Sequence, residues 1–378
     1  MWEIAGLLNP GECVPGSART YAYPNAGFAS TLHYVAGLIS LGAAYKPASE
    51  PSSGHPERGS SENPEGGDPS GNAEGGGSSG NAGQSRPRRV NPSAFVLDPE
   101  QPWVYSLGHP TCPRKGSFAC YFDPWGNCTS KEATGEATFN VPETLVDHFA
   151  MVPSRFQHKG VFWWRLAQVR LLLGLHSEGK ERVPGGLNAE TRAELDLDQV
   201  ARSINFTHPI LGLHVRRGDS CHTTLRRGRC VSLSTHLARV EAMVARYNVS
   251  KVFLATDDPS ALEELRRRAP HLTFISLQSF DRSNLQSGDQ VWLEHRLERG
   301  EVDAHQLMLF TLRDLLLLAQ TDFMVGHLAS NLSRLALLLA SARAGPVPFA
   351  SVDGPWCYHW RMCCQLSLSP SSFYSKVC

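Results

Sequence analysis

The sequence has no run of about 20 apolar residues, the length that an α-helix needs to span the hydrocarbon core of a bilayer. It also lacks an excess of either charge, because 36 lysine and arginine residues balance 36 aspartate and glutamate residues. No general field therefore attracts nucleic acid or an anionic membrane, and any anionic ligand must be held by local groups. A charged and then apolar leader at the start is missing too.

Zinc-type Cys-X-X-Cys pairs are absent, although the chain has 10 cysteines. Cys221, His222 and Cys230 form a candidate zinc site, but a disulfide between Cys221 and Cys230 is the simpler interpretation. An even number of cysteines at irregular spacing favours disulfides and an oxidising compartment. We therefore expect the Golgi or another secretory-pathway lumen, with membrane contact only through a leader or anchor absent from this sequence. Asn-X-Ser/Thr sequons agree with that compartment and start at Asn127, Asn205, Asn248 and Asn331.

Residues 47–89 contain no leucine, isoleucine, valine, methionine or aromatic residue and hold ten of the 33 glycines. Such a segment cannot bury enough apolar area to offset its ordering entropy, so we predict a disordered insertion. Residues 1–46 and 90–200 are predicted to form an N-terminal α/β domain. Residues 201–355 are predicted to form a C-terminal domain, and residues 356–378 a cysteine-rich tail.

Strand and helix patterns alternate after an expected linker at 180–204, which predicts an α/β fold with a parallel sheet covered by helices on both faces. In the N-terminal part, a turn at 23–33 is predicted to lead into a helix that ends near 45, and 161–173 has helical spacing. In the C-terminal part we expect strands at 210–215, 252–255, 272–276 and 323–325, and helices at 235–247, 260–268, 304–319 and 331–341.

Two adjacent arginines, Arg216 and Arg217, follow the predicted strand 210–215. The carboxyl end of a buried parallel strand commonly borders a ligand crevice, and guanidinium groups bind diphosphates through bidentate hydrogen bonds. We therefore predict a phosphate clamp. The tripeptide from Arg217 to Asp219 also matches an integrin-adhesion signal, but such signals work from exposed loops, whereas this one ends a core strand.

Acidic residues stand at two further positions of interest. Asp257 and Asp258 follow the second predicted strand and either orient the arginines through salt bridges or cap the next helix; capping is favoured for the pair considered alone. Asp314 interrupts an apolar helix, so its carboxylate needs a donor. Guanine supplies two at its N1 and N2 edge, while an internal pair with Arg313 or a neighbouring helix is favoured without further information.

Small polar residues, Ser330 among them, open the predicted helix 331–341 after a strand. They offer backbone amides, a hydroxyl and a helix dipole to phosphate, although helix capping explains them as well. Arg216, Asp257, Asp314 and Ser330 are all expected near the crevice of one doubly wound sheet. Independent caps would not need that shared position, which favours one anion-binding site.

These residues resemble the α1,6-fucosyltransferase group, with the nodulation-type chitooligosaccharide fucosyltransferases, in the superfamily of the protein O-fucosyltransferases. The resemblance is carried by HPILGLHVRRGD, VFLATDDPSALEEL, LTFISL and LRDLLLLAQTDFMVGHLASNLSRLALLL, and more weakly by AGFASTLH and VFWWRLAQV. It covers residues 205–353 well and the first domain in patches. It implies a two-domain GT-B-like fold whose C-terminal Rossmann-type domain holds GDP-fucose as donor substrate, without a cofactor or metal ion.

The resemblance also implies residue roles. Arg216 would bind the β-phosphate and stabilise the leaving diphosphate. Asp314 matches the carboxylate that reads guanine, and Ser330 matches a phosphate-binding serine. The other matching positions are His214, Arg217, Asp219, Asp257, Asp258, Asn331, Gly27 and His33.

The family's proposed general base, a glutamate in the loop after its Arg-Arg-X-Asp motif, has no match here. Ser220 and approximately Thr224 occupy the positions of a family lysine and of that glutamate. Asp219 and His222 are the alternative candidates, and His222 is favoured because imidazole titrates near neutral pH. The SH3-like module of the vertebrate-type enzymes is replaced by the tail 356–378, so we expect a different acceptor.

We therefore expect an inverting glycosyltransferase that moves fucose from GDP-fucose to a hydroxyl of a glycan or glycoprotein. The missing glutamate motivates an alternative, a catalytically inactive relative that binds nucleotide sugar or glycan. An adhesion protein that uses the Arg-Gly-Asp signal is the third and least favoured interpretation.

Overall fold

The computed structural model describes residues 19–21, 27–44, 95–97, 101–112, 116–124, 152, 154–174, 185–218, 221, 230–285, 291–354 and 356. Two parallel sheets lie in this part of the chain. The smaller one pairs β1 (Arg19–Tyr21) with β2 (Phe95–Leu97). The predicted insertion 47–89 and nearly all of the tail 356–378 fall outside the described residues.

The larger sheet has five parallel strands in the order β5-β4-β3-β6-β7. Its central strand is buried along its whole length, as expected for the unbroken apolar segment in which it lies. The register places Leu213 opposite both Leu254 and Val325. The strands are β3 (Leu211–Val215), β4 (Lys251–Thr256), β5 (Thr273–Ile275), β6 (Phe323–Gly326) and β7 (Phe349–Ser351).

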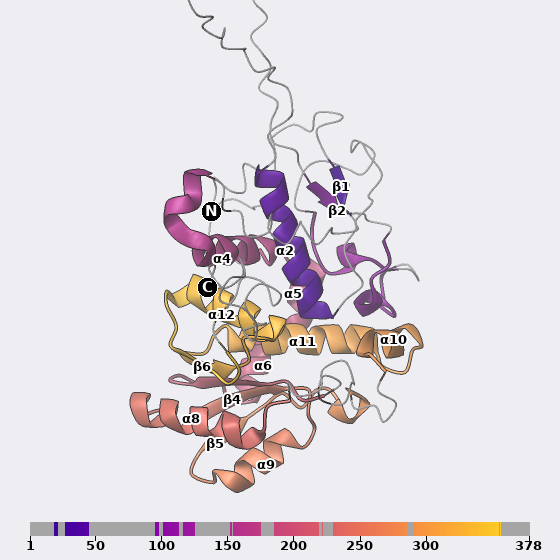
Figure 1. Ribbon diagram of the computed structural model, residues 1–378. Helices are drawn as coiled ribbons and strands as arrows, with labels where there is room; N and C mark the ends of the chain where they lie inside the picture. The colour runs from indigo at the N-terminus through magenta and orange to yellow at the C-terminus, as the bar shows by residue number, and fades with distance from the viewer. Residues whose placement is uncertain are drawn as a thin grey trace, which may run out of the picture.

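Helices cover both faces of this sheet, as predicted (Figure 1). Helices α8 (Leu233–Tyr247) and α9 (Ala261–Arg268) pack on one face against alternate strand residues such as Leu211 and Leu213. Helices α11 (Ala304–Leu318) and α12 (Asn331–Ala344) cover the other face. The chain approaches closely at Gly212, where a Cβ would lie 2.6 Å from Thr321 Oγ1 just after α11. The α/β class with a doubly covered parallel sheet is therefore confirmed.

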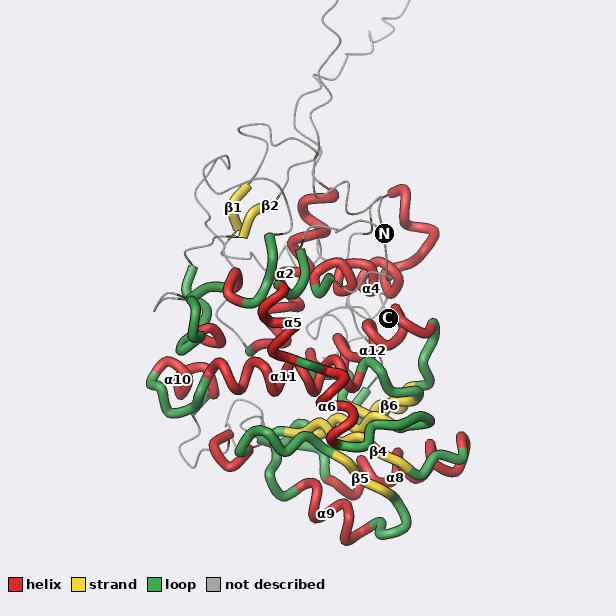
Figure 2. The backbone as a smooth tube through the Cα atoms, turned by 180° about the vertical axis from the view of Figure 1, so that it is seen from behind, coloured by secondary structure: helices red, strands yellow, loops and turns green. Residues whose placement is uncertain are grey.

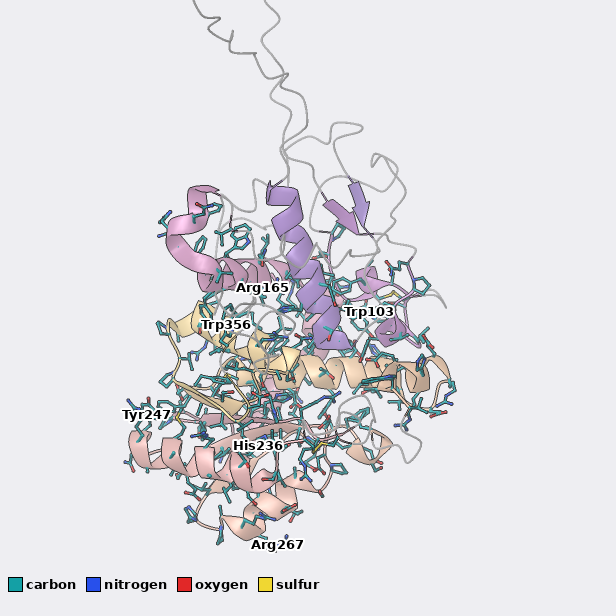
Figure 3. All side chains as sticks on the ribbon, in the orientation of Figure 1. Trp103, Arg165, His236, Tyr247, Arg267 and Trp356 are labelled. Carbon is teal, nitrogen blue, oxygen red and sulfur yellow. A yellow bond between two sulfur atoms is a disulfide. The ribbon has the colours of Figure 1, made fainter. Side chains whose placement is uncertain are left out.

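The N-terminal part packs on the outer side of this helix layer. Helices α2 (Phe28–Ala44) and α4 (Gly160–Leu172) lie against α12, and the view from behind places them on the same side of the molecule (Figure 2). One hydrophobic cluster runs through both parts, from Phe28 and Trp103 to Leu312 and Ala340. Figure 3 shows Trp103 beside the end of α2 that approaches α11. The division of the chain into domains at residue 200 stays a prediction.

Three parts of the sequence prediction need correction. The expected linker 180–204 contains two short helices, α5 (Ala189–Leu195) and α6 (Leu197–Ser203), capped by Asn188 and Asp196. Helix α10 (Leu293–Glu298) and strand β7 were not predicted. The remaining short elements are the 3₁₀ helices η1 (Val104–Ser106), η2 (Phe118–Cys120), η3 (Ser154–Lys159) and η5 (Arg282–Leu285). None of the helices in the described ranges is long and apolar enough to cross a membrane.

Candidate functional site

The strand order places a topological switch point at the centre of the sheet. The first strand, β3, continues to β4 and β5 on one side, and the chain then crosses to β6 and β7 on the other. Open α/β sheets bind ligands outside the carboxyl ends of the strands at such a point. Arg216 follows β3 and the segment from His327 to Ser330 follows β6, so both predicted phosphate-binding segments lie at this edge.

Two aspartates hold the paired arginines from the neighbouring strand. Arg216 Nη1 forms an ion pair with Asp257 Oδ2, and Asp257 Oδ1 accepts a hydrogen bond from the Arg217 amide at 2.7 Å. Arg217 Nη1 lies 3.1 Å from Asp258 Oδ2. The arginine side chains remain 31% and 30% exposed, whereas those of the aspartates are 11% and 5% exposed. The guanidinium groups are thus fixed from behind while part of each stays open to a ligand.

The structure shows the salt-bridge role of the acidic pair, whereas the N-cap of α9 is Ser260 and no side chain caps that helix. Asp257 serves the arginines, which is the salt-bridge role. Asp258 pairs with Arg217 and also accepts from Ser260 N at 2.8 Å and Ser260 Oγ at 2.7 Å, which closes the turn before α9. Because Arg217 is engaged in this pair at the end of a buried strand, its placement argues against an adhesion loop.

Glycine is required after the arginines. A Cβ on Gly218 would lie 2.8 Å from Asp257 Oδ2, closer than real Cβ contacts come. Asp219 and His222, the candidates for the base, lie outside the described residues. Cys221 and Cys230 form a disulfide with an S–S distance of 2.03 Å, so the alternative of a zinc site at these cysteines is wrong. No cluster of metal-binding side chains occurs within the described residues.

The segment after β6 uses its backbone amides internally, which corrects the expectation that they are offered to phosphate. Leu328 N and Ala329 N donate to the Asp353 carboxylate at 2.8 and 3.1 Å, and His327 N donates to Ser333 Oγ at 3.1 Å. Ser330 makes no side-chain capping bond at the start of α12. The hydroxyl of Ser330 and the N-terminus of α12 therefore remain for an anion, and the capping interpretation of Ser330 is wrong.

Three histidines lie behind the arginines. His236 Nδ1 donates to the Ser232 carbonyl at 2.8 Å, so neutral His236 accepts at Nε2 from His327 Nε2 at 2.7 Å. The pKa of His236 is lowered to about 4, mainly by burial and secondly by the nearby His327. The pKa of His214 is held well below its ordinary value, mainly by burial and further by the nearby His327 and Arg216. His214 Nδ1 lies 2.6 Å from Ser333 Oγ. His214 is therefore neutral at pH 7 and links β3 to α12.

Asp314 lies inside the helix layer with a partner that the sequence did not reveal. Its pKa is raised to about 8, because burial outweighs the opposing charge of Arg282. Arg282 donates to Thr256 O and Ser276 Oγ, each at 2.9 Å, and stacks over Phe310. Asp314 Oδ1 is buried and accepts no hydrogen bond from any described residue.

The alternative of an internal pair with Arg313 is wrong, because Arg313 donates to the carbonyls of Glu194 and Leu195 instead. A buried acceptor without a donor is costly in a folded protein. Asp314 is therefore available to a ligand that supplies N–H groups.

The N-terminus of α2 meets the N-terminus of α12. Asn331 Nδ2 donates to Ser30 Oγ at 2.7 Å, and Arg334 donates to Asn331 Oδ1. Gly27 lies directly before α2, and a Cβ at this position would lie 3.2 Å from Glu294 Oε1. His33 is buried one turn further on, and its carbonyl accepts from Arg165 at 2.5 Å. Two helix N-termini thus converge beside Ser330.

Comparison with known proteins finds similarity mainly in the C-terminal half of the chain. Residues 187–353 match the family model of the alpha-(1,6)-fucosyltransferase N- and catalytic domains. An alpha-(1,6)-fucosyltransferase from Drosophila melanogaster is 26% identical over 141 residues, which are 36% of this chain and 19% of the relative. The chain thus aligns with about a fifth of that relative. The resemblance to α1,6-fucosyltransferases is confirmed for this segment, which is divergent in sequence.

Solved structures of fucosyltransferases are also similar to this chain. NodZ alpha-1,6-fucosyltransferase soaked with GDP-fucose has 16% identity and a TM-score of 0.39, with 85% of this chain and 92% of that one covered. POFUT1 in complex with GDP-fucose has 12% identity and a TM-score of 0.32, with 50% and 49% covered.

Sequence reasoning missed Arg282, Asp353 and Glu294. Arg282 opens the short 3₁₀ helix η5 and Asp353 lies just after β7, and no periodicity marks either position. Glu294 lies in the first turn of α10, a position at which an acidic residue is ordinary. A search for carboxylates and guanidiniums that directly follow each short apolar segment would have singled out Asp353, since it comes two residues after β7.

Proposed function

We propose that this protein is an inverting, metal-independent glycosyltransferase that transfers fucose from GDP-fucose to a hydroxyl of a glycan or glycoprotein. The observation that carries this proposal is that the Arg216–Asp257 pair stands at the switch point of the sheet, where β3 lies next to β6, the strand that leads to α12. Fixed cations at this point suit a leaving diphosphate, whose charge grows as the bond to the sugar breaks. The match of residues 187–353 to the alpha-(1,6)-fucosyltransferase model supports the choice of donor.

The predicted residues that the structure describes have roles in this proposal, while Asp219 and His222 stay candidates for the base. Arg216 and Arg217 bind the diphosphate, with Asp257 and Asp258 orienting them. Asp314 accepts the N1 and N2 protons of guanine. Ser330 Oγ donates to phosphate, and Asn331 holds the N-terminus of α12 to that of α2 through Ser30. Gly27 and His33 belong to α2, and His214 supports α12 through Ser333.

Acceptor and compartment belong to the same proposal. A glycan or glycoprotein hydroxyl is the proposed acceptor, and the secretory-pathway lumen, in particular the Golgi, is the proposed compartment. The disulfides Cys112–Cys120 and Cys221–Cys230 support an oxidising environment.

A thermal-shift titration with GDP and a transfer assay test the proposal. GDP at about 100 times its dissociation constant should stabilise the protein by about 2.7 kcal/mol and raise the melting temperature. Arg216→Ala should abolish both this shift and the transfer of fucose, detected by mass spectrometry over a panel of N-glycan, chitooligosaccharide and peptide acceptors. Arg267→Ala, an exposed arginine on α9 far from the switch point (Figure 3), is the matched control and should leave both unchanged.

The outcomes separate the proposal from its alternative. A melting curve that GDP does not move contradicts the proposed site. A GDP shift without turnover of GDP-fucose or any competing nucleotide sugar identifies the catalytically inactive relative that the missing glutamate suggests.

A further inference from the structure

Transfer to a hydroxyl requires a group that takes the hydroxyl proton as the oxygen attacks the anomeric carbon. Most carboxylates at the switch point are already engaged. Asp257 and Asp258 pair with the arginines, and Asp353 holds two backbone amides. Asp314 is buried within α11. None of these four carboxylates is free to meet an acceptor.

Glu294 is different, because it lies at the edge of the donor site and has no cationic partner. Its side chain is partly buried on α10, which lies at the N-terminal end of α11 in Figures 1 and 2. Glu294 Oε1 accepts a hydrogen bond from the Tyr105 hydroxyl at 3.2 Å. Among the described residues no lysine, arginine or histidine forms an ion pair with it, whereas its helix neighbour Glu298 pairs with His295.

Gly27 shows where the Glu294 carboxylate lies relative to α2. A Cβ built on Gly27 would lie 3.2 Å from Glu294 Oε1 and 3.8 Å from Ser30 Oγ, so the carboxylate and the hydroxyl share one side of the α2 N-terminus. Ser30 Oγ in turn accepts from Asn331, the residue after Ser330. Glu294 therefore stands next to the converging helix ends that face the proposed diphosphate, on the N-terminal side of the site.

We propose that Glu294 is the general base of the transfer; this inference rests on the proposed function. The acceptor O–H proton moves to the Glu294 carboxylate while an electron pair of that oxygen forms the bond to the anomeric carbon. The bond from the anomeric carbon to the β-phosphate oxygen breaks, and GDP leaves with that electron pair, its charge met by Arg216. The Tyr105 hydroxyl fixes the carboxylate, and the oxygen Oε2, which forms no hydrogen bond to a described residue, receives the proton.

The test compares Glu294→Gln with Glu298→Gln, one turn further on the same helix. Glu294→Gln keeps the shape and an acceptor for Tyr105, so GDP affinity and melting temperature should stay at the wild-type values. Its kcat with GDP-fucose and the acceptor that the wild type uses should fall about 100- to 10,000-fold, the usual contribution of general-base catalysis. The acid limb of the kcat–pH profile should disappear with it. Glu298→Gln should behave as the wild type.

Each failure has a distinct signature. If the wild type binds GDP but turns over no donor, the proposed function fails and the role of Glu294 with it. If the wild type is active and Glu294→Gln keeps its kcat, or if Asp219→Asn or His222→Gln alone removes the acid limb, only the inference about Glu294 is overturned. Tyr105→Phe removes the hydrogen bond to Glu294 without touching the carboxylate. If Glu294→Gln and Tyr105→Phe lower the melting temperature and the GDP affinity by similar amounts, Glu294 has a structural role and the inference is wrong.

Discussion

At the scale of single residues, the proposed contact of Asp314 with guanine predicts a pH dependence of nucleotide binding. Its pKa in the ligand-free protein is about 8, because the carboxyl is buried and Arg282 offsets that burial only in part. Guanine donates two hydrogen bonds, so it needs the ionised carboxylate. Below pH 8, GDP binding must first release the proton.

We predict that GDP affinity rises by about tenfold per pH unit between pH 6 and pH 8 and levels off above pH 8. Titration calorimetry in buffers of different ionisation enthalpy measures both the affinity and the proton released. Asp314→Asn is the control, because it keeps the shape and cannot ionise, so the protons of the nucleotide itself can be subtracted. An affinity whose pH dependence is the same in wild type and Asp314→Asn would show that this carboxyl does not read the base.

The same raised pKa acts on folding. The unfolded chain ionises Asp314 near the ordinary value of 3.8, whereas the folded, ligand-free protein keeps its proton up to about pH 8. Stability contributed by this group is therefore present at acid pH and is lost as the pH rises through that range.

At the scale of elements, the segment between β6 and α12 depends on the strand β7 beside it. Asp353, two residues after β7, accepts from Leu328 N and Ala329 N and lies 3.6 Å from His327 Nδ1. Burial alone would raise the pKa of Asp353, but the bonds from His327 and the two amides outweigh it and lower the pKa. The charge of Asp353 therefore holds the helix end that carries Ser330.

We predict that Asp353→Asn lowers the free energy of unfolding by about 1–3 kcal/mol at pH 7, the usual cost of removing charge-assisted hydrogen bonds from a buried group. GDP affinity should fall as well, because Ser330 is no longer held in place. The pKa of Asp353 is lower in the folded protein than its ordinary value of 3.8. The difference in unfolding free energy between the variant and the wild type should therefore shrink as the pH falls below 3.8 and Asp353 takes up a proton. Urea denaturation at several pH values measures this.

Ser351→Ala removes the hydrogen bond from the Ser351 hydroxyl to Asp353 Oδ1. It should lower the free energy of unfolding by less than Asp353→Asn does. A loss for Asp353→Asn that does not change with pH would contradict the assigned charge.

Elements of the C-terminal half were predictable from the sequence because each buried strand is a short apolar segment that ends in polar residues. The predicted strand at 252–255 differs from β4 by one residue at each end. Helices α5 and α6 were missed because each has only seven residues, too short for a periodic pattern to stand out. Strand β7 was missed because it is a three-residue edge strand and only partly buried.

The site was predictable where one residue breaks a local pattern, as Arg216 and Asp314 do. It was not predictable where the partner lies far along the chain. The electrostatic influence of Arg282 on Asp314 and the proximity of Glu294 to Gly27 arise only when separate elements pack together. Neither pair has a spacing that a sequence pattern could reveal.

At the scale of the whole molecule, the N-terminal and C-terminal parts share one hydrophobic cluster and a buried polar link. Tyr121 is fully buried, and its hydroxyl lies 2.8 Å from His305 Nδ1 on α11 and 3.2 Å from the Tyr105 carbonyl. The Tyr121 hydroxyl donates to that carbonyl, and His305 Nε2 lies 2.8 Å from Glu194 Oε1, so Tyr121 and His305 connect the two parts of the chain. A shared core of this kind favours one cooperative unit over two independent domains.

We therefore predict a single calorimetric unfolding transition in the full chain, and that Tyr121→Phe moves this whole transition to lower temperature. The variant leaves the Tyr105 carbonyl and His305 Nδ1 without the hydroxyl that lies between them, which costs about 1–3 kcal/mol for a buried group. GDP affinity should not change, since Tyr121 lies outside the phosphate site. Tyr247→Phe is the control, because phenylalanine keeps the ring that stacks on Phe323. Two transitions, of which Tyr121→Phe moves only one, would show instead that the parts unfold as separate domains divided near residue 200.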